Sequence, residues 1–265
     1  MSESAQPAPG RIVSSTPLAR YRLADNPGPM SLDGTKSYIL AAEPGGPCVI
    51  VDPGPADEGH LAALAAAGAV ELVLITHRHP DHTEGAERFH QLTGAPVRAA
   101  DPAFCFGGTP LQDGEVISAG GVEIQVLATP GHTSDSVCFF LPADGPNGSV
   151  LTGDTILGRG TTVLDYPDGT LQDFMASLEK LGRLGPATVL PAHGPDLENL
   201  ESVVLTYRDH RDERLAQIRG VLGLLGEDAT VEQVANAVYA DVPASVRAAA
   251  ELSVAAQLEY LRVRG

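Results

Sequence analysis

Four metal-type side chains stand within the short run His77-Arg78-His79-Pro80-Asp81-His82. Because His77 and His79 are two residues apart, an extended backbone projects both imidazoles to the same side, toward one ion. Pro80 then turns the chain, so that Asp81 and His82 can face a second point nearby. This spacing predicts two adjacent metal ions. The alternative is a polar loop whose histidines only satisfy local charge, since a short motif can occur by chance.

Three later segments each place one more ligand-type residue beside a glycine, at the end of an apolar run. They are Thr129-Pro130-Gly131-His132, Leu151-Thr152-Gly153-Asp154 and Leu190-Pro191-Ala192-His193-Gly194. Glycine lets the backbone turn tightly and approach a ligand. If the four segments converge, one ion binds His77, His79 and His132, the other binds Asp81, His82 and His193, and Asp154 bridges the two.

Histidine and carboxylate ligands without thiolate indicate two Zn²⁺ ions, although Mn²⁺ or Fe would tolerate the oxygen-rich second position. Two cations ~3.5–4 Å apart lower the pKa of a shared water from about 15.7 toward neutrality. They provide a metal-bridging hydroxide without a separate general base, and they polarise the carbonyl or phosphoryl oxygen under attack. The sequence therefore predicts a dinuclear hydrolase in which the ligands Asp81 and Asp154 are catalytic.

The elements that must position these residues come in two blocks of strands, each followed by helices. Periodicity and turn residues predict strands at 37–42, 48–52, 70–75, 97–100, 122–128 and 136–141, and helices at 57–67, 83–92 and 173–184. The first two strands form a hairpin, and the strand at 70–75 leads into the histidine cluster. Two sheets packed face to face with helices outside, an αββα sandwich of the α+β class, suit this order.

The composition changes after Gly194, where only helices are predicted. They span about 197–225, a short segment opened by the capping box of Thr230 and Gln233, and about 244–262. We therefore expect a disordered segment at 1–15, a catalytic domain at 16–200 and a small all-α, winged-helix-like domain at 201–265. From Tyr207 onward seven arginines face nine acidic residues. Without a basic stripe, this unit is interpreted as a cleft wall or a homodimer contact, and duplex DNA is not expected as a partner.

The net charge of −17 disfavours nonspecific binding to nucleic acid, because an acidic protein repels phosphate backbones at long range. Cys48, Cys105 and Cys138 form no C-x-x-C pair, which is typical of reduced cysteines in a cytoplasmic protein. The first ten residues lack the apolar core of a signal peptide, and no run approaches membrane-spanning length. We expect a cytoplasmic protein without a membrane partner.

The joint pattern His77-x-His79-x-Asp81-His82, followed by His132, Asp154 and His193, resembles the metallo-β-lactamase superfamily over about residues 20–200. The resemblance implies an αββα sandwich with the metals at the edge of its two sheets. Because Asp154 stands where the antibiotic-cleaving enzymes have cysteine, it also implies phosphodiester, thioester or lactone substrates in preference to β-lactams.

A narrower resemblance, to the mitochondrial β-lactamase-like endoribonuclease family, covers nearly the whole chain. It is carried by Asn26-Pro27-Gly28-Pro29-Met30 leading to Asp33-Gly34-Thr35-Lys36-Ser37-Tyr38, by the stretch 153–162, by Ala192-His193-Gly194-Pro195 and by the helix of His210-Arg211. It implies zinc-dependent cleavage of single-stranded RNA. The chain departs from that family at Lys36 and Arg159 and shows no β-wing. Lys36, Arg159, Thr161 and Thr162 are candidate substrate-binding residues because Arg forks and hydroxyls suit phosphate or carboxylate groups.

Two alternatives to RNA cleavage stay open. The same machinery could hydrolyse a small thioester or lactone, in the manner of glyoxalase II-like enzymes, which suits the acidic surface. A non-catalytic binding protein that kept the fold is the third interpretation, but all seven ligand positions are filled.

Overall fold

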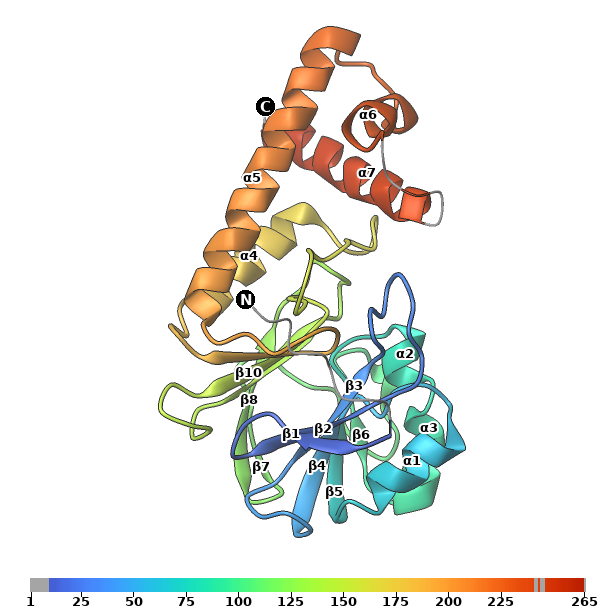
Figure 1. The fold of residues 1–265 in the computed structure, drawn as a ribbon, viewed down its shortest axis with the longest axis vertical. Coiled ribbons are helices and arrows are strands. Elements are labelled where there is room, and N and C mark those ends of the chain that lie inside the picture. The colour runs from blue at the N-terminus through green and yellow to red at the C-terminus, as the bar shows by residue number, and fades with distance from the viewer. Residues whose placement is uncertain (1–9, 241–242, 244–245, 265) are drawn as a thin grey trace.

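The computed structural model describes residues 10–240, 243 and 246–264, and it contains two mixed sheets packed face to face (Figure 1). The first sheet has the order β1-β2-β3-β4-β5-β6, and the second has the order β11-β10-β9-β8-β7. The strands of the first are Ile12–Ser14, Ala19–Leu23, Lys36–Leu40, Pro47–Val51, Ala69–Leu74 and Val97–Arg98. Those of the second, β7 to β11, are Val116–Ala119, Val122–Ala128, Val137–Leu141, Ser149–Gly153 and Thr188–Pro191. The predicted αββα sandwich is confirmed.

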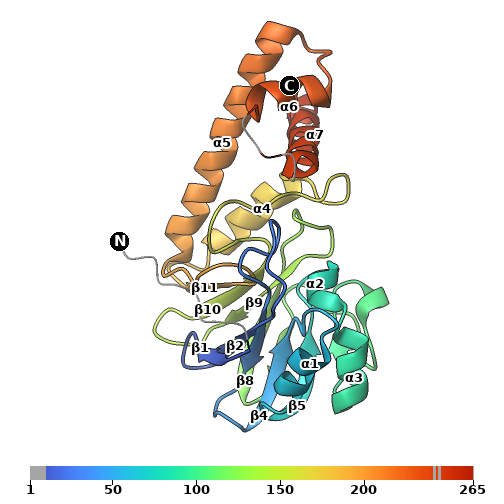
Figure 2. The same ribbon diagram turned by 45° about the vertical axis from the view of Figure 1, so that its right-hand side comes forward.

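Alternation along the strands divides the apolar residues between two layers. In β4, Val49 and Val51 join the core between the sheets, whereas Cys48 and Ile50 face outward. The outer face of the first sheet is covered by α1 (Glu58–Ala65) and α3 (Ala86–Thr93), and that of the second by α4 (Leu171–Gly182) and the start of α5 (Leu200–Leu225). Figure 2 shows these helices on opposite sides of the sandwich. Each sheet therefore buries both of its faces.

The long helix α5 runs out of the sandwich and carries the remaining helices, α6 (Val231–Val238) and α7 (Arg247–Arg264) (Figure 1). Its first half packs against α4, and its second half forms a separate small core with α6 and α7 around Ile218, Leu222, Val234 and Val254. The predicted capping box is present at the start of α6, with Thr230 and Gln233 bonded reciprocally. None of the described helices is long and apolar enough to cross a membrane.

Several predicted elements differ from the observed ones. Residues 12–14 were expected in a disordered segment but form β1, because their backbone pairs with Arg20–Arg22 of β2; residues 1–9 of that segment lie outside the described part of the chain. The predicted helix at 83–92 is two helices, α2 (Pro80–Thr83) and α3, that meet at Gly85. A Cβ atom at Gly85 would lie 2.8 Å from the end of the Leu61 side chain and 3.0 Å from the backbone oxygens of Gly54 and Pro55, so this close approach favours glycine.

Candidate metal centre

The seven predicted ligands follow strand ends that meet at one edge of the sandwich. His77 follows β5, His132 follows β8, Asp154 follows β10 and His193 follows β11. Backbone hydrogen bonds hold the two sheets together at this edge: Val137 donates to the carbonyl of Thr76 at 2.8 Å, and Lys36 donates to that of Ala192 at 2.9 Å. The structure thus brings together residues that lie far apart in the sequence.

The ligand atoms form two groups, each with all atoms within 4.8 Å of one another: His77, His79, His132 and Asp154, and Asp81, His82 and His193. In the first group, Nδ1 of His79 lies 3.0 Å from Nε2 of His77 and 3.0 Å from Nε2 of His132. Two nitrogens bound tetrahedrally at about 2.0–2.1 Å from Zn²⁺ would lie about 3.3 Å apart. The first group therefore has the spacing of ligands to one small cation.

Asp154 lies between the two groups and offers one oxygen to each. Its Oδ2 is 3.7 Å from Nε2 of His132, in the first group. Its Oδ1 is 3.3 Å from Nε2 of His193 and 3.6 Å from Nε2 of His82, in the second. Asp81 completes the second group, with Oδ2 3.2 Å from Nε2 of His193. This is the arrangement required of a carboxylate that bridges two cations.

Each of the five imidazoles is fixed through the ring nitrogen that points away from the centre. Nδ1 of His132 lies 2.6 Å from the carbonyl of Val163, and Nδ1 of His193 lies 3.1 Å from that of Gly34. Nε2 of His79 is 3.4 Å from a carboxylate oxygen of Asp165. These acceptors hold the proton on the outer nitrogen, so the inner nitrogen keeps its lone pair for a metal.

Asp52 fixes the remaining two histidines. Its Oδ2 lies 2.8 Å from Nδ1 of His82 and accepts from the hydroxyl of Thr76 at 2.7 Å; Thr76 Oγ1 in turn lies 3.1 Å from Nδ1 of His77. The other carboxylate oxygen of Asp52, Oδ1, accepts a hydrogen bond from the backbone N–H of Thr76 at 2.8 Å. Asp52 has the left-handed φ of 53°, which aspartate tolerates better than most residues. In the sequence, Asp52 is only the last residue of the predicted strand at 48–52, and its role behind the histidines was not predicted.

The carboxylate ligands are likewise held from behind. The hydroxyl of Thr35 donates to Oδ2 of Asp81 at 2.9 Å, and the amide of Asn26 donates to Oγ1 of Thr35 at 2.9 Å. Neither Thr35 nor Asp165 was singled out from the sequence, because no local motif marks them. Asn26 and Thr35 did occur in the segments that carry the narrower family resemblance, and this was the available signal.

Electrostatics divide the two groups. Burial, followed by the neighbouring His82 and His132, lowers the pKa of His77 well below its ordinary value, and burial also lowers the pKa of His132. Burial opposes the charge on His193 as well, but Asp154 and Asp81 outweigh it and raise its pKa to about 10. The same attraction from the histidines lowers the pKa of Asp154 although burial acts against ionisation. In the second group a cation would therefore take the place of the protons that the carboxylates of Asp81 and Asp154 favour on the neighbouring histidines.

Two buried polar atoms support a metal at this position. Within the described part of the chain, Nε2 of His82 and Oδ1 of Asp154 are inaccessible to solvent and have no hydrogen-bond partner. Such atoms carry a desolvation cost of about 1–3 kcal/mol each unless something binds them. Both point into the ligand cluster, and the donor set of imidazole and carboxylate without thiolate fits two Zn²⁺, Mn²⁺ or Fe ions.

The four predicted substrate-binding residues are placed differently. Lys36 is only 1% exposed, and its Nζ is paired with Asp196 at 2.7 Å, so it does not line the metal cavity. Arg159 is bound to both oxygens of Asp33 at 2.6 and 2.8 Å. Thr161 lines a separate cavity near the C-terminal helices.

Thr162, the fourth of these residues, supports the centre from behind. Its hydroxyl donates to the carbonyl of the bridging ligand Asp154 at 2.7 Å. Its own carbonyl accepts a hydrogen bond from the buried guanidinium of Arg211, on α5. Tyr207, one turn earlier on α5, accepts at its hydroxyl from the backbone of Leu157 at 2.8 Å. Through these two contacts α5 holds the loop that follows Asp154 in place.

A cavity of about 300 Å³ gives access to the metal centre. Besides the ligands His79, Asp81, His132, Asp154 and His193, it is lined by Asn26, Met30, Ser31 and Pro80. Met30 is 54% exposed and offers an apolar surface at the mouth. Of the described lining residues, only the metal ligands are titratable.

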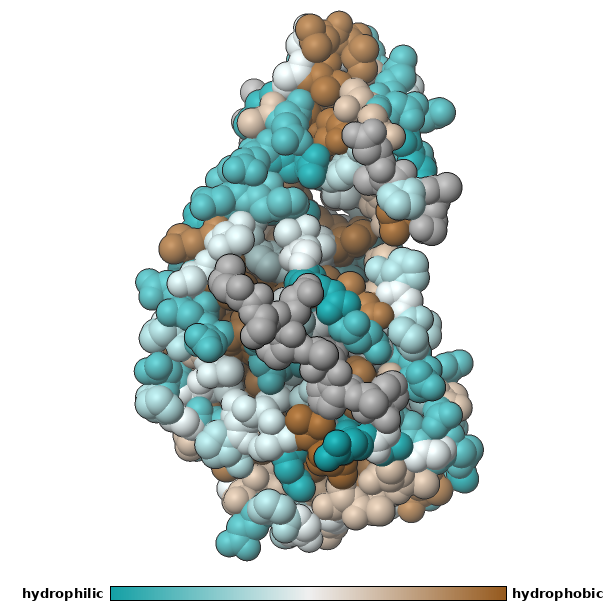
Figure 3. Space-filling view, in the orientation of Figure 1, coloured by the Kyte–Doolittle hydropathy of each residue, from teal (hydrophilic) through white to brown (hydrophobic). Residues whose placement is uncertain are grey.

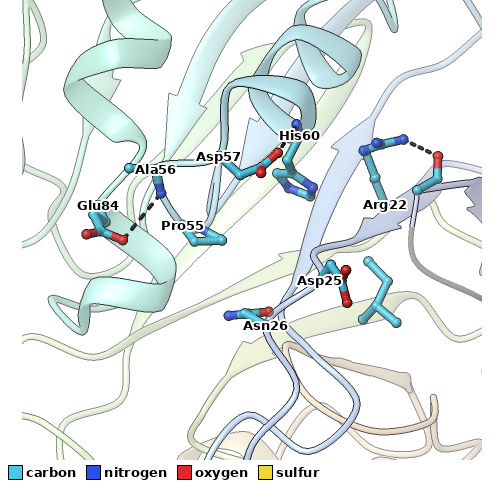
Figure 4. Close-up of a pocket in the computed structure, with 10 residues that line it drawn as sticks. Arg22, Asp25, Asn26, Pro55, Ala56, Asp57, His60 and Glu84 are labelled. Carbon is cyan, nitrogen blue, oxygen red and sulfur yellow. Dashed lines mark hydrogen bonds between the residues drawn. The ribbon is translucent and has the colours of Figure 1, made fainter.

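A larger cavity of about 470 Å³ lies beside β2 and the start of α1 (Figure 4). Arg22, Asp25, Asp57, His60 and Glu84 line it, together with Asn26, which it shares with the metal cavity. His60 is buried, and its Nε2 lies 2.8 Å from the hydroxyl of Ser37. This cavity contains no ligand of either metal group.

Comparison with known proteins agrees with this geometry. The family model described as the metallo-beta-lactamase superfamily matches residues 31–193, and that of the beta-lactamase associated winged helix domain matches residues 230–265. A beta-lactamase-like protein 2 homolog from Caenorhabditis elegans is 32% identical over 271 residues, which cover 90% of this chain and 82% of that protein.

Two further similarities complete the comparison. An atrochrysone carboxyl ACP thioesterase from Aspergillus fumigatus is 32% identical over 243 residues, which cover 84% of this chain and 74% of that protein. The crystal structure of a metallo-beta-lactamase family protein from Thermus thermophilus superimposes with a TM-score of 0.77 at 23% identity, covering 94% of each chain. This structural similarity includes the C-terminal helices as well as the sandwich.

Proposed function

The chain is a metal-dependent hydrolase of the metallo-beta-lactamase superfamily with a C-terminal beta-lactamase-associated winged-helix domain, and from this premise we propose that it hydrolyses an acyl thioester. We further propose that the centre holds two Zn²⁺ ions. When bound, the cations would activate water and polarise the acyl carbonyl. The chain's own residues hold them: three histidines on one side, Asp81 with two histidines on the other, and Asp154 between.

The observation that supports a thioester is the lack of a proton donor in the metal cavity. Its non-ligand lining residues in the described chain are Asn26, Met30, Ser31 and Pro80, none of which titrates near neutral pH. A thiol has a pKa of about 8.5, so a thiolate can leave without protonation. An alkoxide leaving group is a much stronger base and benefits from a general acid. Among these substrates, the thioester depends least on a protein group that protonates the leaving group.

Charge around the centre also favours a thioester over a polyanion. Arg78 is paired with Asp165 and Asp168, Arg159 with Asp33, and Lys36 with Asp196. A long RNA strand would have to compete with these carboxylates in a protein of net charge −17. The relative named as an ACP thioesterase supports the same choice.

Cleavage of single-stranded RNA stays the second candidate, because the segments at 26–30 and 153–162 carry the narrower resemblance to an endoribonuclease family. Lactones and β-lactams rank below both. All of these reactions would use the same ligands, so they differ in substrate and not in metal chemistry.

One assay panel tests the proposal. Protein of measured metal content is given an acyl-pantetheine thioester, a glutathione thioester, an acyl lactone, a short unstructured RNA and a chromogenic β-lactam. Thioester turnover that is lost in Asp154→Ala, together with loss of metal from that variant, supports the proposal. Preferential cleavage of RNA would instead establish the second candidate.

A further inference from the structure

A small cavity of about 180 Å³ lies between the C-terminal helices and the loop at 161–163. Its polar lining comes from Thr161, His210, Arg211, Arg214, Tyr239 and Ser253. The space-filling view shows that the molecule is hollowed between the C-terminal helices and the sandwich (Figure 3). No described residue lines both this cavity and the metal cavity. The wall of the smaller cavity nevertheless includes Thr162 and Val163, which contact Asp154 and His132.

Two guanidinium groups line the cavity, and the described residues contribute no carboxylate to its lining. Arg211 is 2% exposed, donates to the carbonyl of Thr162 and stacks 4.9 Å from the ring centre of Phe174. Arg214 lies 4.5 Å from the ring centre of Tyr239. Among the described residues, no carboxylate forms an ion pair with either guanidinium, whereas Arg78, Arg159 and Lys36 all have one. The charge of Arg211 is buried without a counter-ion, which is costly. Arg214 is half-buried and donates from Nη1 to Oε1 of Gln217 at 2.7 Å, so it adds a second positive charge that is still without a carboxylate. Together the two arginines favour a bound anion.

Unpaired hydrogen-bonding nitrogens and a positive local potential also favour an anion in this cavity. Within the described chain, Nε of Arg211, Nε of Arg214 and Nδ1 of His210 are buried without a partner. Burial, and then Arg211 and Arg214, lower the pKa of His210, while Glu213 acts in the opposite direction with less effect. The imidazole thus senses a positive potential in a protein that is strongly negative overall.

We propose that this cavity binds a phosphate group, and that the phosphate belongs to the phosphopantetheine arm on which an acyl thioester is carried. The second part rests on the proposed thioesterase function. Two guanidinium groups suit a tetrahedral anion with several acceptor oxygens, and the hydroxyls of Thr161 and Ser253 line the same space as neutral donors. Because one loop separates this cavity from Asp154 and His132, a long flexible arm anchored here could present its thioester to the metals.

The site itself is tested with inorganic phosphate and the metal-loaded full-length chain. NMR follows the His210 ring, since phosphate could also bind the metals but would not then act on this imidazole. We expect phosphate to raise the pKa of His210. The NMR signals of the His90 ring should not respond to phosphate. Arg214→Gln should weaken the phosphate effect at least 10-fold, whereas the exposed Arg208→Gln on the same helix should not. Should His210 fail to respond to phosphate in the folded wild-type protein, there is no anion site here.

The source of the phosphate is tested with a matched pair of substrates, an acyl-pantetheine and the same acyl group on 4′-phosphopantetheine. In Arg214→Gln, KM for the phosphorylated thioester should rise at least 10-fold relative to KM for the other, with Arg208→Gln as control. Equal changes for both substrates, with phosphate still acting on His210, would overturn the assignment to the substrate and identify free phosphate as the ligand. If no thioester is turned over, the proposed function fails, while the NMR result still decides whether the site exists.

Discussion

Asp52 and His82, thirty positions apart in sequence, are joined by a contact of 2.8 Å between Oδ2 and Nδ1, and both side chains are almost completely buried. Through Thr76 the same carboxylate also orients His77. One residue that touches no metal position therefore sets the geometry of a ligand in each of the two groups.

Asp52→Asn is expected to lower metal affinity about 10- to 100-fold, because the amide cannot hold the imidazole of His82 as the charged carboxylate does. Asparagine tolerates the left-handed backbone at this position, so the fold should persist. The measurement is a competition titration with a chelator of known affinity. Asp57→Asn, a change at the N-cap of α1 away from the metals, is the matched control. Wild-type affinity in Asp52→Asn would contradict this role.

Thr162→Val removes the hydroxyl that donates to the carbonyls of Asp154 and Thr155. Leaving these buried acceptors unsatisfied should cost about 1–3 kcal/mol of unfolding free energy. The bridging carboxylate should also be less well fixed, so fewer than two metals per chain are expected after dialysis. Thr162→Ser, which restores a hydroxyl, should recover both metal content and stability. A defect shared equally by the serine variant would show that packing of the methyl group, and not the hydrogen bonds, is what matters.

Lys36→Met tests whether this lysine has a structural or a substrate-binding role. Its ammonium is buried against the ring of Tyr21 and paired with Asp196, which is 29% exposed. Because Asp196 retains contact with water, the loss of stability should be smaller than the about 3–5 kcal/mol typical when one partner of a fully buried pair is removed. KM should not change. Adding Asp196→Asn should restore part of the stability, and a raised KM with normal stability would return Lys36 to the substrate site.

His60 should make the protein sensitive to moderate acid. Burial, and then the charge of Arg22, lower its pKa in the folded protein to about 4, from 6.5. Between these values the unfolded chain binds a proton that the folded chain excludes. The folded state therefore loses stability as pH falls from about 6.5 to 4, by about 3 kcal/mol in all. Chemical denaturation at several pH values should show a shallower loss for His60→Gln, and identical slopes for the two proteins would refute the assignment.

Much of the site is visible in the sequence because its spacing is local. The order His77, His79, Asp81, His82 follows from one turn at Pro80, and His132, Asp154 and His193 each end an apolar run. What could not be foreseen depends on long-range folding. Asp165 contacts His79 although the two residues are 86 positions apart, and no motif near Asp165 predicts this contact.

Elements and burial were predicted less completely. In β2, Ala19–Leu23 alternates between buried and half-buried residues, a pattern present in the sequence but masked by its two arginines. Lys36 was predicted to bind substrate, but every residue of β3 is buried. The ion pair with Asp196 offsets the cost of burying the lysine charge. The contacts of Arg211 and Tyr207 with the loop at 157–162 were not predicted, because they depend on how α5 crosses the sandwich.

The packing of α5 ties the C-terminal helices to the two-sheet sandwich. Leu200, Val204, Tyr207 and Leu215 belong to the same apolar layer as Val150, Phe174 and Leu178, and Ala256 of α7 joins them. A chain shortened after Gly194 would leave that layer open to water and prone to self-association. The helical tail is therefore not a detachable accessory, because the residues that pack on the sandwich can change only together with the surface that they cover.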